Sequence, residues 1–140
     1  MNILLSLDIG EKRIGLAVSD ETGTLARPLF ALARASKQQD FTQIAALRDE
    51  YHIVRIVAGL PKTLRNEEGP QARRVRRYAD ELAAAIGIPL EFWDERFSSI
   101  EAQERMTAAS RQQRDRGAID AAAAAIILQE YLDAHRAVTN

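Results

Sequence analysis

An acidic residue ends the first apolar run of the chain, where it could hold a cation. Residues 3–10 read Ile-Leu-Leu-Ser-Leu-Asp-Ile-Gly, which indicates a strand covered on both faces. The carboxylate of Asp8 would therefore need a metal ion, a cation or several hydrogen-bond donors. A local alternative is that Asp8 accepts hydrogen bonds within the turn at Gly10. Gly15, on the next predicted strand, either allows close packing or clears space for a ligand.

Further acidic residues stand at two other junctions of predicted elements. Asp94 and Glu95 follow a short apolar strand, and Asp120 falls in the first turn of a strongly helical segment. Each has a simple alternative role. The acidic pair could bind the adjacent arginine in a solvated loop, and Asp120 could favour the positive end of its helix. A shared chemical role requires these carboxylates to meet in space, so it depends on the fold.

The hydrophobic periodicity predicts five strands and their connecting helices. Apolar residues three and four positions apart indicate helices, and shorter apolar or alternating runs indicate strands. Asp40 is placed to cap the first helix, Ser98 and Glu101 fit a capping box, and Pro28 puts the third strand at a sheet edge. The predicted strands are 3–10, 14–19, 25–33, 54–57 and 90–93, and the helices are 41–51, 72–86, one opening at 98, and 121–134.

This order of elements predicts an α/β fold with helices on both faces of a mixed sheet. Right-handed crossovers give the strands, numbered along the chain, the order 3-2-1-4-5, with strand two antiparallel. Asp8 and the Asp94–Glu95 pair then lie at the carboxyl ends of parallel strands, where open α/β sheets bind ligands. Strands one and five are roughly 10 Å apart. Because Gly59 leaves that gap open and Glu95 is the longer side chain, we favour Glu95, with Asp94 as the alternative.

The composition limits the class of protein. With 140 residues, of which 46% are hydrophobic, we expect one domain over residues 1–140. Cysteine is absent, and His52 and His135 lie too far apart to form a cluster, so oxygen must hold any metal. No apolar run reaches the roughly 18 residues of a membrane span, which predicts a cytoplasmic protein. A net charge of −1 means that nucleic-acid binding would need local basic patches.

Four sequence blocks resemble one known family. They read L-D-I-G-E-K-R-I-G-L-A-V-S-D, then V-A-G-L-P followed by E-G-P-Q-A, then D-E-R-F-S-S-I-E-A, then I-D-A-A-A-A-A-I-I-L-Q-E-Y-L. In these blocks the chain resembles the YqgF family, whose members are described as pre-16S rRNA nucleases and as Holliday junction resolvase-like. The resemblance implies a ribonuclease H-like fold, and it matches Asp8, Glu95 and Asp120 to the acidic positions of the family's active site.

Basic residues near the acidic edge are candidates for phosphate contact. The family often has threonine at the positions of Ser98 and Ser99, and a lysine shortly before the last aspartate, where this chain offers only arginines. Residues 108–117 lack apolar periodicity and are expected to form a mobile polar loop. The arginines of 73–77 read as a solvated helix face. The residues expected to contact phosphates are Lys12, Arg13, Arg111, Arg114 and Arg116.

An acidic cradle of this kind suits phosphodiester hydrolysis. Two divalent ions about 3.5–4 Å apart can stabilise the attacking and leaving oxygens, and Mg²⁺ prefers carboxylate ligands. We expect Asp8, Glu95 and Asp120 to hold two Mg²⁺ or Mn²⁺ ions, with Asp94 as an alternative ligand. The resulting prediction is a metal-dependent nuclease, a hydrolase acting on ester bonds. The resemblance implies that it processes the 5′ end of pre-16S rRNA in ribosome biogenesis, with structured RNA and ribosomal particles as partners.

Other functions fit the same pattern. Branched DNA is the alternative substrate, as for a Holliday junction resolvase. A catalytically silent nucleic-acid or ribosome-binding module would keep the fold without cleavage. A small-molecule phosphotransferase is more distant, because related enzymes enclose their nucleotide between two domains and only one is expected here. We expect a monomer or a weak homodimer, with no membrane association.

Overall fold

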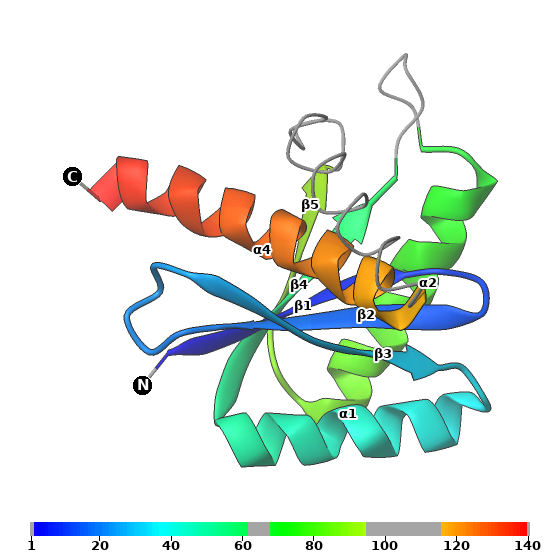
Figure 1. Ribbon diagram of the computed structural model, residues 1–140. Coiled ribbons are helices and arrows are strands. Elements are labelled where there is room, and N and C mark those ends of the chain that lie inside the picture. Colours follow the sequence, from blue (N-terminus) through cyan, green and yellow to red (C-terminus); the bar gives the residue numbers. More distant parts are fainter. Residues whose placement is uncertain (1, 62–67, 95–115, 140) are drawn as a thin grey trace.

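A five-stranded mixed sheet forms the centre of the molecule (Figure 1). The computed structural model describes residues 2–61, 68–94 and 116–139. The strands are β1 (Ile3–Ile9), β2 (Arg13–Ser19), β3 (Ala26–Ala33), β4 (Ile53–Leu60) and β5 (Leu90–Asp94). Their order is β3-β2-β1-β4-β5, with β2 antiparallel to both neighbours and β4 parallel to β1 and β5. The predicted order and strand directions are confirmed.

Helices cover both faces of this sheet. They are α1 (Lys37–Tyr51), α2 (Pro70–Ile86) and α4 (Arg116–Thr139). In Figure 1, α1 and α2 lie on one side of the sheet and α4 crosses the other. Alternation along β1 separates the two sides, because Leu5 and Leu7 join the core under α1 and α2, while the Ser6 hydroxyl donates to the Ala124 carbonyl of α4 at 2.7 Å. Asp8 shares the alternation of Ser6 and so belongs to the α4 side.

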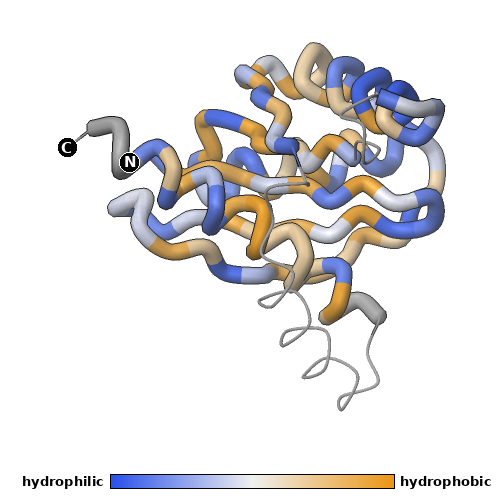
Figure 2. Tube along the Cα trace, turned by 90° about the horizontal axis from the view of Figure 1, so that it is seen from above, coloured by the Kyte–Doolittle hydropathy of each residue, from blue (hydrophilic) through white to orange (hydrophobic). Residues whose placement is uncertain are grey.

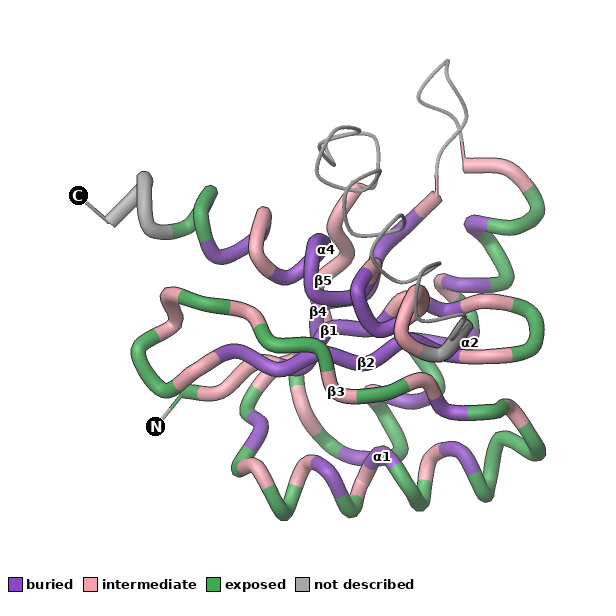
Figure 3. Tube along the Cα trace, viewed as in Figure 1, coloured by how far each residue is buried: buried purple, intermediate pink, exposed green. Residues whose placement is uncertain are grey.

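The buried residues concentrate on the central strands. Figure 3 shows β1, β2 and β4 largely buried, and Figure 2 shows the hydrophobic residues gathered along the strands. β3 is an edge strand, as Pro28 predicted, and Phe30 on it is 44% exposed. No helix in the described part of the chain combines the length and hydrophobicity that crossing a bilayer requires.

α1 begins earlier than the sequence predicted. Ser36 is its cap, since the Ser36 side chain accepts from the Gln39 N–H at 3.1 Å and the Gln39 side chain accepts from the Ser36 N–H. Asp40 is instead 1% exposed inside the first turn, where it accepts from the Tyr78 hydroxyl of α2 and the Ala35 N–H, both at 3.0 Å. The capping prediction for Asp40 was wrong because its carboxylate ties α1 to α2.

α4 also begins earlier than predicted, at Arg116. The expectations that Arg116 lies in a loop and that Asp120 lies in the first turn were therefore wrong, and the first turn holds no acidic residue. The favourable effect of a helix N-terminus on a carboxylate falls off beyond the first turn. A favourable interaction with the helix N-terminus therefore does not explain the position of Asp120. Residues 108–115 and the helix expected at Ser98 lie outside the described residues.

Candidate active site

Gly15 brings two of the predicted acidic residues together. In the β1–β2 pair, Gly15 is the direct partner of Asp8. The backbone of Asp120 in α4 lies against the same glycine, so that a Cβ at Gly15 would be 2.0 Å from the Asp120 carbonyl oxygen. Only a residue without a side chain admits the helix this closely. Close packing at Gly15 is therefore confirmed, and it places Asp8 and Asp120 around one point of the sheet.

Asp120 holds a positively charged partner from β2. The Nε of Arg13 donates to Oδ2 of Asp120 at 2.6 Å, and the two side chains are 35% and 26% exposed. A partly exposed pair of this kind stabilises the fold by about 1 kcal/mol at most. The ion pair matters more for the chemistry of this edge than for stability, because it shows that a cation can occupy a position next to the Asp120 carboxylate. Arg13, expected to contact phosphate, is bound to the acidic site itself.

The turn after β1 begins two residues beyond Asp8 and belongs to the β1–β2 hairpin. The Gly10 N–H donates to the Arg13 carbonyl at 2.9 Å and so closes the β1–β2 hairpin. Asp8 is intermediate in exposure at the end of the strand. Lys12 is exposed at the hairpin turn, where its carbonyl accepts from the Arg34 N–H at 2.9 Å. The hairpin thus presents a lysine beside the acidic edge.

The alternative acid, Asp94, occupies the other side of the sheet by alternation. Trp93 belongs to the α4 side, since its Nε1 donates to Glu130 of α4 at 3.3 Å. Asp94 is the next and last residue of β5. Neighbouring residues of a strand face opposite ways. Asp94 therefore has the register of the α2 side, whereas Asp8 and Asp120 meet on the α4 side.

The other predicted site residues are not all within the described structure. Glu95, Arg111 and Arg114 lie outside the described residues, and so does the side chain of Arg116, although its backbone begins α4. Among the described residues, no group of three or more acidic or histidine side chains could hold a metal ion. The structure brings together Asp8 and Asp120, and a role for Glu95 stays a prediction.

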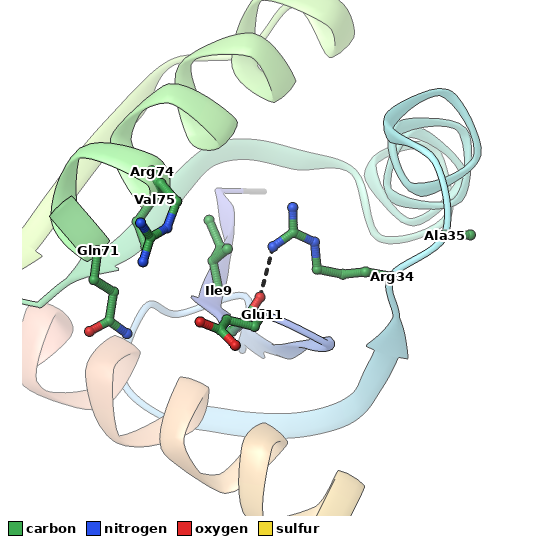
Figure 4. Close-up of a pocket in the computed structure, with 8 residues that line it drawn as sticks. Ile9, Glu11, Arg34, Ala35, Gln71, Arg74 and Val75 are labelled. Atoms are coloured by element: carbon green, nitrogen blue, oxygen red, sulfur yellow. Dashed lines mark hydrogen bonds between the residues drawn. The ribbon is translucent and has the colours of Figure 1, made fainter.

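The structure also contains a cavity that the sequence did not indicate, between the β1–β2 hairpin and α2 and away from α4 (Figure 4). Its volume is about 360 Å³, and it is lined by Ile9, Gly10, Glu11, Arg34, Ala35, Gln71, Arg74 and Val75. These residues come from the hairpin, the β3–α1 connection and the start of α2. Sequence patterns marked the α2 arginines only as a solvated face, because no local signal reveals that three distant segments converge.

Comparison with known proteins identifies relatives over nearly the whole chain. A protein from Microcystis aeruginosa is 47% identical over 135 residues, covering 96% of this chain and 93% of its own length. One from Chloroflexus aurantiacus is 42% identical over 139 residues, covering 99% of this chain and 91% of its own. Both relatives are named "Putative pre-16S rRNA nuclease".

Solved structures show the same fold at low sequence identity. T. thermophilus RuvC in complex with a Holliday junction substrate has a TM-score of 0.62 at 14% identity, covering 98% of this chain and 97% of that one. The fowlpox virus Holliday junction resolvase has a TM-score of 0.56 at 12% identity, covering 94% and 99%. The predicted ribonuclease H-like fold is confirmed. Because residues 2–134 match the family described as "RuvX: Holliday junction resolvase", which the sequence blocks predicted as YqgF, the chain belongs to the RuvX family.

Proposed function

We propose that this chain is a metal-dependent nuclease that hydrolyses phosphodiester bonds in structured RNA. The observation that carries the proposal is the meeting of Asp8 and Asp120 around Gly15, at the carboxyl end of β1. The names of relatives 42–47% identical to this chain support pre-16S rRNA as the substrate. Action at the 5′ end of that RNA is what the family resemblance implies. We propose ribosomal particles as the setting of the reaction.

The donor set of this edge fits a hard divalent cation. Asp8 and Asp120 offer only carboxylate oxygens, which Mg²⁺ and Mn²⁺ prefer, and the guanidinium of Arg13 already supplies positive charge at Asp120. We assign Asp8, Asp120 and Glu95 as ligands of two ions. Such ions, when bound, would stabilise charge on the attacking and leaving oxygens of the phosphodiester. The carboxylates would hold the ions in place. Because Asp120 would then bind an ion, Arg13 would be released to contact a substrate phosphate.

The preference for Glu95 over Asp94 follows from the register of β5. Trp93 lies on the α4 side with Asp8, and Asp94 takes the opposite alternation. We therefore assign the role to Glu95, whose longer side chain suits the roughly 10 Å between β1 and β5.

The phosphate contacts are assigned to the basic residues that flank this edge. Lys12 is exposed on the hairpin beside Asp8. Arg111, Arg114 and Arg116 precede Asp120 in the sequence. Each phosphate that these residues neutralise releases roughly 0.7–0.9 of a counterion, so RNA affinity should fall steeply with salt. Replacing the three arginines by alanine should flatten the salt dependence and leave metal binding unchanged. An identical slope would show that they do not contact the phosphates.

A cleavage assay with site variants tests the nuclease proposal. The purified chain is incubated with a pre-16S rRNA fragment and Mg²⁺ or Mn²⁺, and product ends are mapped. Asp8→Asn, Glu95→Gln and Asp120→Asn should each abolish cleavage while circular dichroism and thermal unfolding show an intact fold. Asp94→Asn is the matched control and should retain most activity. Full activity of Asp8→Asn, or no cleavage by the wild type, would overturn the nuclease assignment. Loss in Asp94→Asn with activity in Glu95→Gln would reverse the choice between them.

Branched DNA is the second candidate substrate. The family is described as Holliday junction resolvase, which favours testing it directly. A four-way junction and the RNA are therefore compared under identical conditions. Cleavage of the junction but not of the RNA would show that the substrate is branched DNA, and the nuclease assignment would stand. Tight RNA binding without cleavage in Mg²⁺ and Mn²⁺ would instead indicate a silent binding module.

A further inference from the structure

We infer that the cavity between the β1–β2 hairpin and α2 binds one unpaired nucleotide of the substrate RNA. The inference rests on the proposed function, since it takes RNA as the ligand. The cavity measures about 360 Å³. Pockets for small ligands range from about 300 to 1,000 Å³, so this one is of a size for a single nucleotide. Single-stranded RNA is commonly recognised by splaying out individual bases into such sites.

Arg74 is the basic side chain available for a phosphate. It projects from α2 into the cavity (Figure 4). Its neighbours are engaged elsewhere, because Arg73 donates to the Glu68 carbonyl at 3.2 Å and Arg76 pairs with the Glu68 carboxylate. Across the described ranges, Arg74 itself makes no ion pair or hydrogen bond. A cation that faces a cavity without a partner is suited to an anionic ligand.

Arg34 forms a rigid opposite wall. Its Nη1 donates to the Gly10 carbonyl at 2.8 Å, the hydrogen bond drawn in Figure 4, and its guanidinium carbon lies 4.6 Å from the centroid of the Tyr78 ring. The Tyr78 hydroxyl donates to the buried Asp40 carboxylate, which fixes the ring that Arg34 packs on. Arg34 therefore offers a fixed planar surface and spare N–H donors, while Arg74 carries the uncompensated charge.

The remaining lining favours a nucleotide over a bare anion. The Glu11 carboxylate would repel a free phosphate, but it can accept from the amino or imino group of a base. The Gln71 amide can both donate and accept, as the edge of a base requires. Ile9 and Val75 add apolar surface for the face of the base. A phosphate on Arg74 and a base between these groups would use every kind of contact that the cavity offers.

The position of the cavity suits a nucleotide next to the cleaved bond. Gly10 and Glu11 follow Asp8 by two and three residues, which is roughly 7–10 Å of extended chain. The cavity opens on the α1 and α2 side of the sheet, and Asp8 lies on the α4 side. An RNA strand that crosses the exposed turn at Lys12 would reach both. The cavity would then fix which phosphodiester bond lies over the carboxylates.

Nucleotide titration of the full chain without metal tests this inference. The 5′-monophosphates of the four ribonucleosides, and separately inorganic phosphate, are added in excess chelator, and side-chain N–H signals of Gln71 and Arg74 are followed by NMR. Nucleotides should shift both signals saturably. Arg74→Ala should weaken binding about tenfold or more, the usual effect of losing a charged hydrogen bond. Arg77→Ala is the matched control, because Arg77 is exposed on the same helix but does not line the cavity, and it should bind like the wild type.

Two results of the titration would overturn the inference. One is equal nucleotide affinity in Arg74→Ala and Arg77→Ala, and the other is inorganic phosphate that binds as tightly as the nucleotides, which would make the cavity a simple anion site. Because the titration contains no metal and measures no cleavage, it is independent of the nuclease assay. Nucleotide binding would support the cavity even if the RNA is not cleaved. An RNA cut at the same positions with the same KM by wild type and Arg74→Ala would count against it.

Discussion

Replacing Gly15 with alanine tests the contact that joins β2 to α4. The added Cβ would lie 2.0 Å from the Asp120 carbonyl oxygen and 2.5 Å from its carbonyl carbon. Ordinary contacts begin at 3.4 Å, so the oxygen must retreat by 3.4 − 2.0, about 1.4 Å. Both groups belong to backbone in regular structure, and neither can rotate away as a flexible side chain would. The helix and the strand must separate.

Gly15→Ala should lower both the unfolding free energy and the rate of cleavage. Overpacking a well-packed site typically costs about 1–3 kcal/mol, and we expect the upper half of that range because backbone must move. Urea denaturation measures this loss of unfolding free energy. A misplacement of about 1 Å in an active site can cost roughly 100-fold in rate. Cleavage by Gly15→Ala, measured where the variant is fully folded, should therefore fall by about that factor.

Ser6→Ala separates these two effects. It removes the 2.7 Å hydrogen bond from β1 to the Ala124 carbonyl of the same helix, without pushing that helix away. It should cost about 1 kcal/mol and leave cleavage close to wild type. An unfolding free energy of Gly15→Ala equal to wild type would refute the contact. Equal loss of cleavage in the two variants would refute the link between helix position and activity.

Three further predictions concern individual contacts. Arg13→Gln should bind Mn²⁺ more tightly than wild type in calorimetry without RNA, because the guanidinium no longer competes for Asp120; weaker binding would contradict this competition. Burial, with the hydrogen bond donated to Glu91, raises the pKa of Tyr131 from 10.0 to about 12. The protonated Tyr131 hydroxyl should stabilise the fold fully below pH 10, and this stabilisation should be lost as pH rises towards 12. The unfolding free energy of Tyr131→Phe, measured with urea, should therefore fall less steeply at alkaline pH than that of the wild type, and an equal fall in both would argue against this role. Asp40→Asn should lower the unfolding free energy by about 1–3 kcal/mol, because an amide has one oxygen in place of the two that accept from Ala35 and Tyr78; an unchanged urea midpoint would show that one oxygen is enough.

The sequence alone determined the sheet and the edge where the chemistry belongs. Apolar runs gave the strands, and the helices between them required parallel crossovers, so the order β3-β2-β1-β4-β5 followed from chirality and connection length. Pro28 marked the edge strand because it lacks an N–H. Asp8 was identifiable because a carboxylate is costly at the end of a buried strand. Each of these signals is local or depends on the order of elements.

Tertiary structure decided what the individual polar residues do. Asp40 looked like a helix cap, but it is a buried link between α1 and α2 because Tyr78 and Ala35 supply its donors. Asp120 looked like a favourable charge at a helix start, but its helix begins earlier and its partner is Arg13. A carboxylate or guanidinium takes its role from the groups that surround it, and these come from positions distant in the sequence. No local pattern could therefore reveal the Asp120–Arg13 pair or the cavity faced by Arg74.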